Sequence, residues 1–314
     1  MSTEALTTDV TLERKPGIIR QALKLGRVRL GIGIAGFLIV ISFIGPFLAP
    51  FGSTEYVDMP NITDVPQKEF DVDYYGGNPV SRAIFDGRSI FGTDYFGQDV
   101  LSRFLFGGRS ILVLAAIATA LALTVGSTLG LLAAYLRGKA DEAIMRTLDV
   151  MLSFPQVLLS LVVISMFGPS RVLIILAVGF STTPRIARIV RGAAVPVVER
   201  DFISAAEALG ESRRRVLFSE ILPNVSSALL VEANLRLTYS IGLIAALAFL
   251  GFTPDPNAAN WGLMIQENRV ALTVQPWGVI LPTLAIALLT IGTGLIGDGL
   301  SRVSAGIDRG GKGE

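Results

Sequence analysis

The 314-residue sequence contains no cysteine and no histidine, and only 17% of its residues are charged. Without cysteine the chain forms no disulfide and offers no thiolate chemistry. Without histidine it lacks the side chain that most often acts as metal ligand, proton shuttle or general base. Its net charge of +1 gives no electrostatic footprint for a nucleic acid. We therefore expect no metal site and no nucleic-acid interface.

The sequence is rich instead in long runs without Asp, Glu, Lys or Arg. A hydrocarbon core of roughly 30 Å needs about 20 apolar residues in a helix. Five runs reach or can be extended to that length, and the fourth in chain order is shorter. The runs are Leu30–Thr54, Ser110–Leu136, Val150–Ser170, Val172–Pro184, Leu237–Pro254 and Val270–Gly297.

Charge distribution favours counting the short run as a span. Cytoplasmic loops of membrane proteins collect Lys and Arg. With six spans and both termini inside, the inner segments hold nineteen of these residues and the outer segments seven. Without the short span, the basic segment 185–220 would lie outside. We predict an all-α membrane protein with six transmembrane helices and cytoplasmic N- and C-termini.

The predicted organisation has four parts. Residues 1–29 form a cytoplasmic lead, and residues 30–108 supply the first transmembrane helix and an external segment. A core of five further spans covers 109–305 and includes a cytoplasmic loop at 193–224, before a tail at 306–314. The external segment is expected to be a small folded cap. Trp261 and Trp277 are expected at the outer membrane interface.

The loop between the fourth and fifth spans is predicted to form two short helices. Asp201 suits an N-cap, Gly210 a left-handed helix end, Ser212 a second N-cap, and Pro223 a limit to the second helix. The first helix carries one apolar stripe, made of Phe202, Ile203, Ala206 and Leu209. Val216, Leu217 and Ile221 form the apolar face of the second helix. The residues alone leave two interpretations open, a helix lying on the inner leaflet or a projection that inserts into a cytosolic partner.

Charged residues in or beside spans have alternative interpretations. Glu232 and Arg236, four residues apart, either line a transport path or form a self-neutralising structural pair. Arg185, Arg188 and Arg191 are expected to anchor the fourth span at lipid headgroups, with contact to a cytosolic partner as the alternative.

Turn and kink residues also have two interpretations. Pro155 marks either a packed kink or a hinge. Four residues before the second span either dock an external partner or only build a turn: Gly92, Asp94, Gly97 and Asp99.

The loop at 193–224 resembles the cytoplasmic loop of ABC-importer permeases. That pattern reads Glu-Ala-Ala, three residues, Gly, nine residues, a variable position, one residue and Leu-Pro. Ala205, Ala206, Gly210, Leu222 and Pro223 match it. Ser204 stands where the pattern has Glu, and Glu220 occupies the variable position.

Five further segments are similar to the dipeptide/oligopeptide group of these permeases. They are "FGTDYFGQDVLSRFLFGGRSIL" (91–112), "DEAIMRTLDVMLSFPQVLL" (141–159), "PRIARIVRG" (184–192), "WGLMIQENR" (261–269) and "LIGDGLSR" (295–302). The extra N-terminal span and external segment resemble the subunit that pairs with a second, different permease. The resemblance extends from residue 91 to 302.

The resemblance implies a channel-forming subunit of an ATP-driven importer in a bacterial or archaeal cytoplasmic membrane. Its partners would be a second permease, two ATP-binding subunits and an extracytoplasmic binding protein. ATP and Mg would be used by those subunits, since this chain has no Walker loop. By the same resemblance, this chain would bind no cofactor and would not be an enzyme.

The resemblance also implies a cargo and a coupling site. The cargo would be di- or oligopeptides, with nickel chelates, glutathione and oligosaccharides as alternatives. An ion-coupled carrier is disfavoured by the scarcity of intramembrane ionisable groups. The ATPase-coupling residues would be Ser204, Ala205, Ala206, Leu209, Gly210, Glu220, Leu222 and Pro223.

Overall fold

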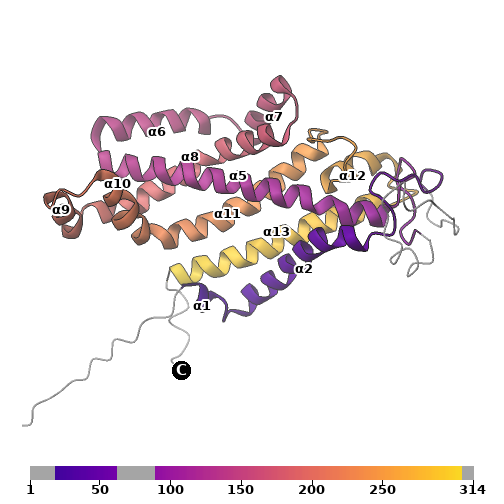
Figure 1. Ribbon diagram of the computed structural model, residues 1–314, viewed down its shortest axis with the longest axis horizontal. Helices are drawn as coiled ribbons and strands as arrows, with labels where there is room; N and C mark the ends of the chain where they lie inside the picture. Colours follow the sequence, from indigo (N-terminus) through magenta and orange to yellow (C-terminus); the bar gives the residue numbers. More distant parts are fainter. Residues whose placement is uncertain (1–17, 62–88, 306–314) are drawn as a thin grey trace, which may run out of the picture.

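The computed structural model describes residues 18–61 and 89–305 as a bundle of roughly aligned helices (Figure 1). Three predicted parts lie wholly or partly outside the described residues: the first part of the lead (1–17), the middle of the external cap (62–88) and the whole tail (306–314). Within the described ranges every regular element is helical, apart from two isolated bridges, Tyr56 to Gln98 and Thr93 to Asp99. This agrees with the predicted all-α class.

Five helices are long and apolar enough to cross a membrane. They are α2 (Gly26–Leu48), α5 (Val100–Leu136), α8 (Arg171–Val198), α11 (Leu222–Phe249, continuous with the preceding turns from Arg213) and α13 (Trp277–Ser304). The 37 residues of α5 correspond to about 55 Å, so this helix extends beyond the hydrocarbon core. Short helices flank them: α1 (Ile18–Ala22), α9 (Asp201–Ala208), α10 (Arg213–Arg215) and α12 (Trp261–Asn268).

The third predicted span is not one straight helix. Of residues 150–170, only the first three lie in α6 (Gly138–Leu152), and most of the others form α7 (Gln156–Phe167); the two helices meet at 81°. Pro155 is the N-cap of α7, where its missing N–H costs no helical hydrogen bond. The described part of the chain therefore has five spans, or six if the bent pair is one. The twelve residues of α7 are too few to cross a bilayer alone.

The fourth predicted span, the shortest of the uncharged runs, is a 28-residue helix, α8. It continues through Arg185, Arg188 and Arg191 because two of these are neutralised by α6. Arg188 is ion-paired with Asp149, and Arg191 donates two hydrogen bonds to Asp141, at 2.6 and 2.5 Å. Both arginines thus have a carboxylate partner in this chain while remaining partly exposed, and their anchoring at lipid headgroups stays a prediction.

Small residues bring the central helices together. A Cβ atom on Gly126 of α5 would lie 2.8 Å from the Cβ of Ile186 in α8, and one on Gly179 would lie 2.8 Å from Leu121 Cδ2. On the other side of the bundle, a Cβ on Gly31 of α2 would lie 2.6 Å from the carbonyl oxygen of Gly292 in α13. Such contacts permit the backbone-to-backbone packing by which helices associate in lipid.

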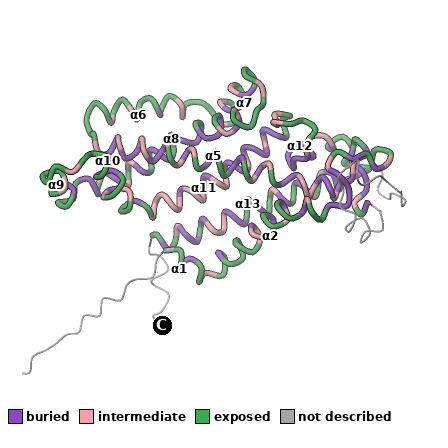
Figure 2. The backbone as a smooth tube through the Cα atoms, viewed as in Figure 1, coloured by how far each residue is buried: buried purple, intermediate pink, exposed green. Residues whose placement is uncertain are grey.

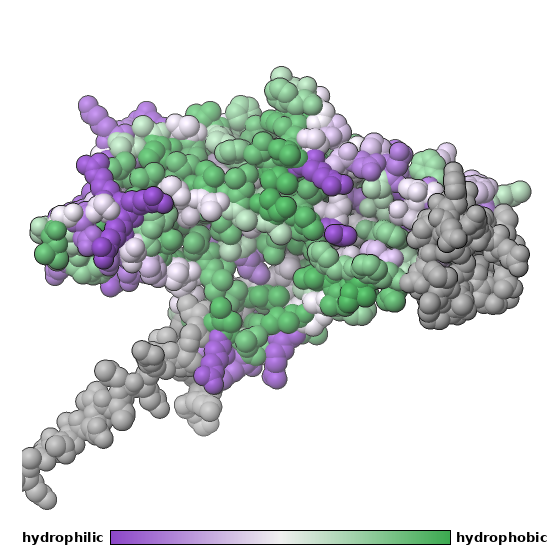
Figure 3. All heavy atoms as spheres, viewed as in Figure 1, coloured by the Kyte–Doolittle hydropathy of each residue, from purple (hydrophilic) through white to green (hydrophobic). Residues whose placement is uncertain are grey.

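Burial and polarity divide the bundle along its length. The facing sides of α5 and α8 are buried, whereas α6 and α7 are mostly exposed (Figure 2). Hydrophilic side chains gather towards the end that carries α9 and α10, while the middle is apolar (Figure 3). The opposite end is built by α12, the residues before α5 and the chain after α2 (Figure 1).

Trp261 corrects a prediction about the outer interface. Its side chain is completely buried, stacked on Phe104 with ring centroids 5.6 Å apart, and its indole N–H donates to the Phe104 carbonyl at 2.8 Å. Trp277 is 40% exposed and does suit an interface. The buried ring therefore joins α12 to α5 instead of meeting lipid headgroups.

Candidate functional site

The loop between α8 and α11 forms the predicted helical hairpin at one end of the bundle (Figure 1). Helix α9 ends at Ala208, and Gly210, just after the C-cap residue, has a left-handed φ of 80°. The Gly210 N–H donates to the Glu207 carbonyl at 3.0 Å, and the Glu211 N–H donates to the Ala206 carbonyl at 3.1 Å. This is the Schellman arrangement, for which glycine is favoured. No atom lies within 4 Å of a Cβ built on Gly210, so its backbone angle alone requires glycine.

The start of α9 differs in detail from the prediction. Asp201 is the first helical residue, and Arg200 is the N-cap without a side-chain hydrogen bond. Ser212 does act as a cap, because its hydroxyl accepts the Arg215 N–H at 3.4 Å. Pro223 lies in the first turn of α11, directly after a π-helical turn at Val216–Ile221.

The predicted apolar stripe of α9 is only partly covered by its own chain. Ile203 is buried with Val216, Leu217 and Ile221 in one hydrophobic cluster. Leu209, by contrast, is 85% exposed, and Phe202 is also exposed. Folding of this chain alone buries almost none of the Leu209 side chain, so it gives almost no hydrophobic stabilisation at this position.

The eight predicted coupling residues share this surface. Ser204, Ala205, Leu209, Gly210 and Pro223 are exposed, and Ala206, Glu220 and Leu222 are half-buried. The fold therefore places the residues of the sequence motif on one accessible hairpin and the first turn of α11.

Glu232 and Arg236 form an ion pair inside α11. The Glu232 carboxylate lies 2.5 Å from Arg236 Nε, and both side chains are buried. The Arg236 guanidinium also lies over the Tyr239 ring, 5.0 Å from its centroid, and Tyr239 is 56% exposed. The charges thus neutralise each other, and the Tyr239 ring contacts the guanidinium.

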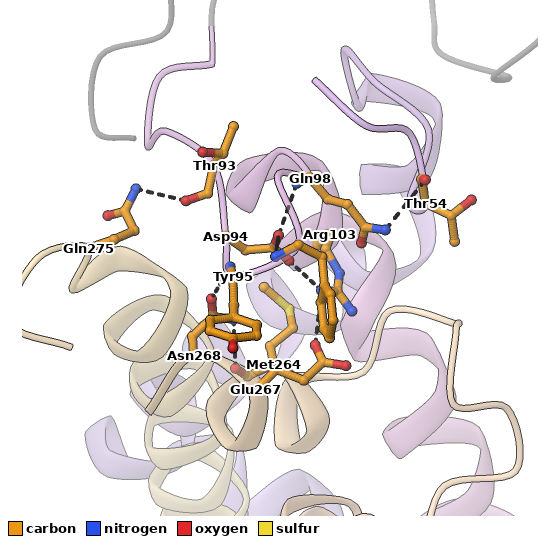
Figure 4. Close-up of polar contacts among 11 residues, drawn as sticks. Thr54, Thr93, Asp94, Tyr95, Gln98, Arg103, Met264, Glu267, Asn268 and Gln275 are labelled. Atoms are coloured by element: carbon orange, nitrogen blue, oxygen red, sulfur yellow. Dashed lines mark hydrogen bonds and ion pairs between the residues drawn. The ribbon is translucent and has the colours of Figure 1, made fainter. Parts of the chain in front are cut away.

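A second polar cluster lies at the opposite end of the bundle (Figure 4). Arg103 of α5 is 1% exposed and forms ion pairs with Asp94 and with Glu267 of α12, the latter at 2.9 Å. Asp94 also accepts the N–H groups of Phe96 and Gln98, both at 2.9 Å. The arginine therefore fixes the turn before α5 to a helix more than 160 residues later in the chain.

Two side-chain amides strengthen the same junction (Figure 4). Asn268 accepts the Tyr95 N–H at 2.9 Å. Gln275 donates to the carbonyls of Phe91 and Thr93 at 2.8 and 3.3 Å. Sequence reasoning missed these contacts. The segment "WGLMIQENR" was recognised as a motif, but nothing in it identifies its distant partner.

The four candidate docking residues all build the turn. Gly92 and Gly97 have φ values of 71° and 75°, which glycine adopts without strain. Asp99 caps α5 by accepting the Ser102 N–H at 2.7 Å. With Asp94, all four are buried, so any docking surface here would instead present the exposed rings of Tyr95 and Phe96.

Burial shifts two carboxyl groups of this end. Loss of water raises the pKa of Asp99 above 3.8, although hydrogen bonds from Ser102 and Ser89 oppose the shift. Loss of water also raises the pKa of Glu267 above 4.5, against the attraction of Arg103. Both carboxyl groups therefore take up a proton more readily in the folded chain than in the unfolded chain.

Comparison with known proteins gives consistent results. The family of binding-protein-dependent transport system inner membrane components matches residues 126–305. The glutathione transport system permease protein GsiD of Pectobacterium atrosepticum is 32% identical over 263 residues, which are 84% of this chain and 81% of that protein. The dipeptide transport system permease protein DppC of Alkalihalophilus pseudofirmus is 37% identical over 179 residues, covering 57% and 59%.

A solved structure shares the fold. The MetNI methionine ABC transporter, in an inward-facing conformation, aligns with 65% of this chain and 96% of its own chain, with a TM-score of 0.51 and 17% identity.

Proposed function

We propose that this chain, which belongs to the binding-protein-dependent transport system inner membrane components and is a permease subunit of an ABC importer, translocates di- or oligopeptides. The observation that carries the cargo proposal is the roughly one-third identity to GsiD and DppC. Dipeptides and glutathione are both small peptides, so one chemical class covers both names. Glutathione is accordingly the second candidate cargo, ahead of nickel chelates and oligosaccharides.

The proposed assembly contains a second permease, two ATP-binding subunits and an extracytoplasmic binding protein. The exposed length of α6 and α7 supports a further membrane subunit, because these helices bury few residues against their own chain. ATP and Mg would be used by the ATP-binding subunits, and this chain would bind no cofactor. The apolar exteriors of α2 and α13 would meet lipid in a bacterial cytoplasmic membrane.

The α9–α10 hairpin is proposed as the element that engages an ATP-binding subunit. Exposed Leu209 would enter a partner's apolar groove, and the Schellman turn at Gly210 would hold its position. The described chain ends, at α1 and the end of α13, lie towards the same end of the bundle as this hairpin (Figure 1). That arrangement supports cytoplasmic termini. The described residues of the predicted external segment, 51–61 and 89–99, lie at the other end.

Reconstitution tests both proposals. The chain, its partner permease and the ATP-binding subunits are placed in liposomes with the binding protein, and ATP-dependent uptake of a dipeptide is measured. We expect uptake only when the ATP-binding subunits are present. Peptide uptake that persists without the ATP-binding subunits would refute ATP-driven import. Uptake of glutathione but not of the dipeptide would replace di- or oligopeptides by glutathione as the cargo.

Gly210→Pro tests the coupling hairpin separately. Proline cannot adopt the positive φ of this position and cannot donate its N–H to Glu207. We expect membrane insertion to be retained while uptake and co-purification of the ATP-binding subunits are lost. Gly192→Ala is the control, since Gly192 lies exposed in α8 with no atom near an added Cβ. Wild-type uptake by Gly210→Pro would exclude the hairpin as the coupling element.

A further inference from the structure

A cavity lies at the end of the bundle that carries α12, apart from the coupling hairpin. Its volume is about 530 Å³, within the range of roughly 300 to 1,000 Å³ typical of small-molecule sites. Residues from α5, from the start of α8 and from the connection between α11 and α12 line it. The polar residues that matter below are Arg109, Ser110, Arg171, Thr253, Asp255 and Asn260.

The cavity is positively charged. Arg109 and Arg171 both line it, and neither forms an ion pair with a carboxylate of the described residues. Arg109 is held against the Phe43 ring, 5.9 Å from its centroid, which leaves its N–H groups available to a ligand. Asp255 is the lining carboxylate, and it accepts the Asn257 N–H at 3.0 Å. Two guanidinium groups thus outnumber one carboxylate.

The backbone adds to the positive potential. Helix α8 begins at Arg171, and α12 begins directly after its N-cap Asn260, so two helix N-termini lie beside the cavity. The positive end of a helix dipole favours an anion.

A buried hydroxyl lies in the wall of the cavity. Thr253 is 2% exposed and lines the cavity. Its hydroxyl has no hydrogen-bond partner among residues 18–61 and 89–305. A buried polar group without a partner is costly, but this oxygen has almost no accessible surface, so an acceptor in the cavity would reach it only after the side chain turned.

We propose that this cavity is a solute subsite that binds the carboxylate of the transported molecule. A guanidinium group matches a carboxylate in geometry as well as charge. The proposal rests on the peptide cargo proposed above, because every unblocked peptide ends in a carboxylate. It assigns the recognition of that group to this chain, in addition to any selection made by the binding protein.

The absence of cysteine permits a direct test of the cavity's charge. Ser110→Cys places the sole thiol of this chain in the cavity, and Thr273→Cys places one on the exposed surface outside it. In the assembled transporter, the modification rate is measured with an anionic sulfonatoethyl and a cationic trimethylammonioethyl methanethiosulfonate. We expect the thiol at position 110 to favour the anionic reagent about tenfold more than the thiol at position 273 does. Adding Arg109→Gln and Arg171→Gln should abolish that preference, and equal ratios at the two thiols would overturn the proposal.

Protection experiments identify the source of the anion. Alanylalanine should slow modification of the thiol at position 110, and its C-terminal amide should not. If both slow it equally, or neither does, a carboxylate subsite is refuted. If protection requires phosphatidylglycerol and is absent in phosphatidylcholine vesicles, a lipid headgroup occupies the cavity and the solute proposal fails. Labelling needs no transport, so failed ATP-dependent uptake of the peptide would overturn the proposed function separately.

Discussion

Replacing Arg103 with methionine should destabilise the end of the bundle that carries α12. Methionine fills a similar volume, so the main effect is to leave the carboxylates of Asp94 and Glu267 without the arginine with which both are ion-paired. Removing one partner of a buried ion pair costs about 3 to 5 kcal/mol. Asp94 keeps two backbone N–H donors, and burial already favours a proton on Glu267. We therefore expect the lower end of that range, about 3 kcal/mol.

The matched control is Arg109→Met, six residues along the same helix. Arg109 is exposed and forms no ion pair with a described carboxylate. Its replacement should therefore lower the free energy of unfolding by less than about 1 kcal/mol. Thermal unfolding of the assembled transporter in detergent compares the two variants. We expect Arg103→Met to lower the midpoint by roughly 5 to 10 °C more than the control.

A double variant tests the stated cause. If the cost arises from stranded carboxylates, Arg103→Met combined with Glu267→Gln should be less damaging than the two single effects added together. Strict additivity, or a single variant as stable as Arg109→Met, would show that the ion pairs do not hold this junction.

Two further predictions concern other carboxylates. Glu232→Gln combined with Arg236→Met should retain more uptake and assembly than Arg236→Met alone, because the single change leaves a buried charge; a double variant worse than Arg236→Met would favour direct contact with solute. The pKa of Glu267 is raised above 4.5 in the folded chain. At pH values above 4.5 the folded chain therefore binds more protons at this carboxyl group than the unfolded chain does. This contribution to stability grows as the pH falls from 7 towards 5. Glu267→Gln should reduce that gain in midpoint, and an unchanged pH profile would contradict the assigned shift.

The fold was predictable where one local property decides it. Uncharged runs located each helix that is long and apolar enough to span. The glycine at position 210 identified a left-handed helix end, which the φ of 80° confirms. Both features depend on residues close together in sequence, so periodicity and turn chemistry were sufficient.

Contacts between residues far apart in the chain could not be predicted from the sequence. The predicted fourth span stopped at Pro184, before the arginines at 185, 188 and 191, because an arginine counts as an interruption until its acidic partner is known. Asp149 and Asp141 supply the partners of the last two from another helix. Trp261 likewise has the composition of an interfacial residue, and only its packing on Phe104 shows that it belongs inside. Pairing across more than 30 residues leaves no local pattern.

The same limit applies to the candidate sites. The predicted coupling residues lie on one contiguous stretch, the hairpin and the first turn of α11, so their surface could be predicted without tertiary contacts. The role of the candidate docking residues could not be predicted from local sequence, because Asp94 and Asp99 are both aspartates of one turn. In the fold one is ion-paired with Arg103 and the other caps α5. Their burial shows that acidic and glycine residues of a turn need not form its exposed surface.

Helix α5 connects these two ends of the molecule. Near one terminus it carries Arg103, and further along its glycines pack against α8 so closely that an added Cβ on Gly130 would lie 2.5 Å from the Ala187 carbonyl oxygen. Helix α8 in turn leads into α9 through only two residues, Glu199 and Arg200. Interlocked backbones resist sliding. A displacement of α9 by an ATP-binding subunit would therefore move α5 and α8 as one unit, and the ion pairs of Arg103 would transmit that motion to the turn before α5 and to α12.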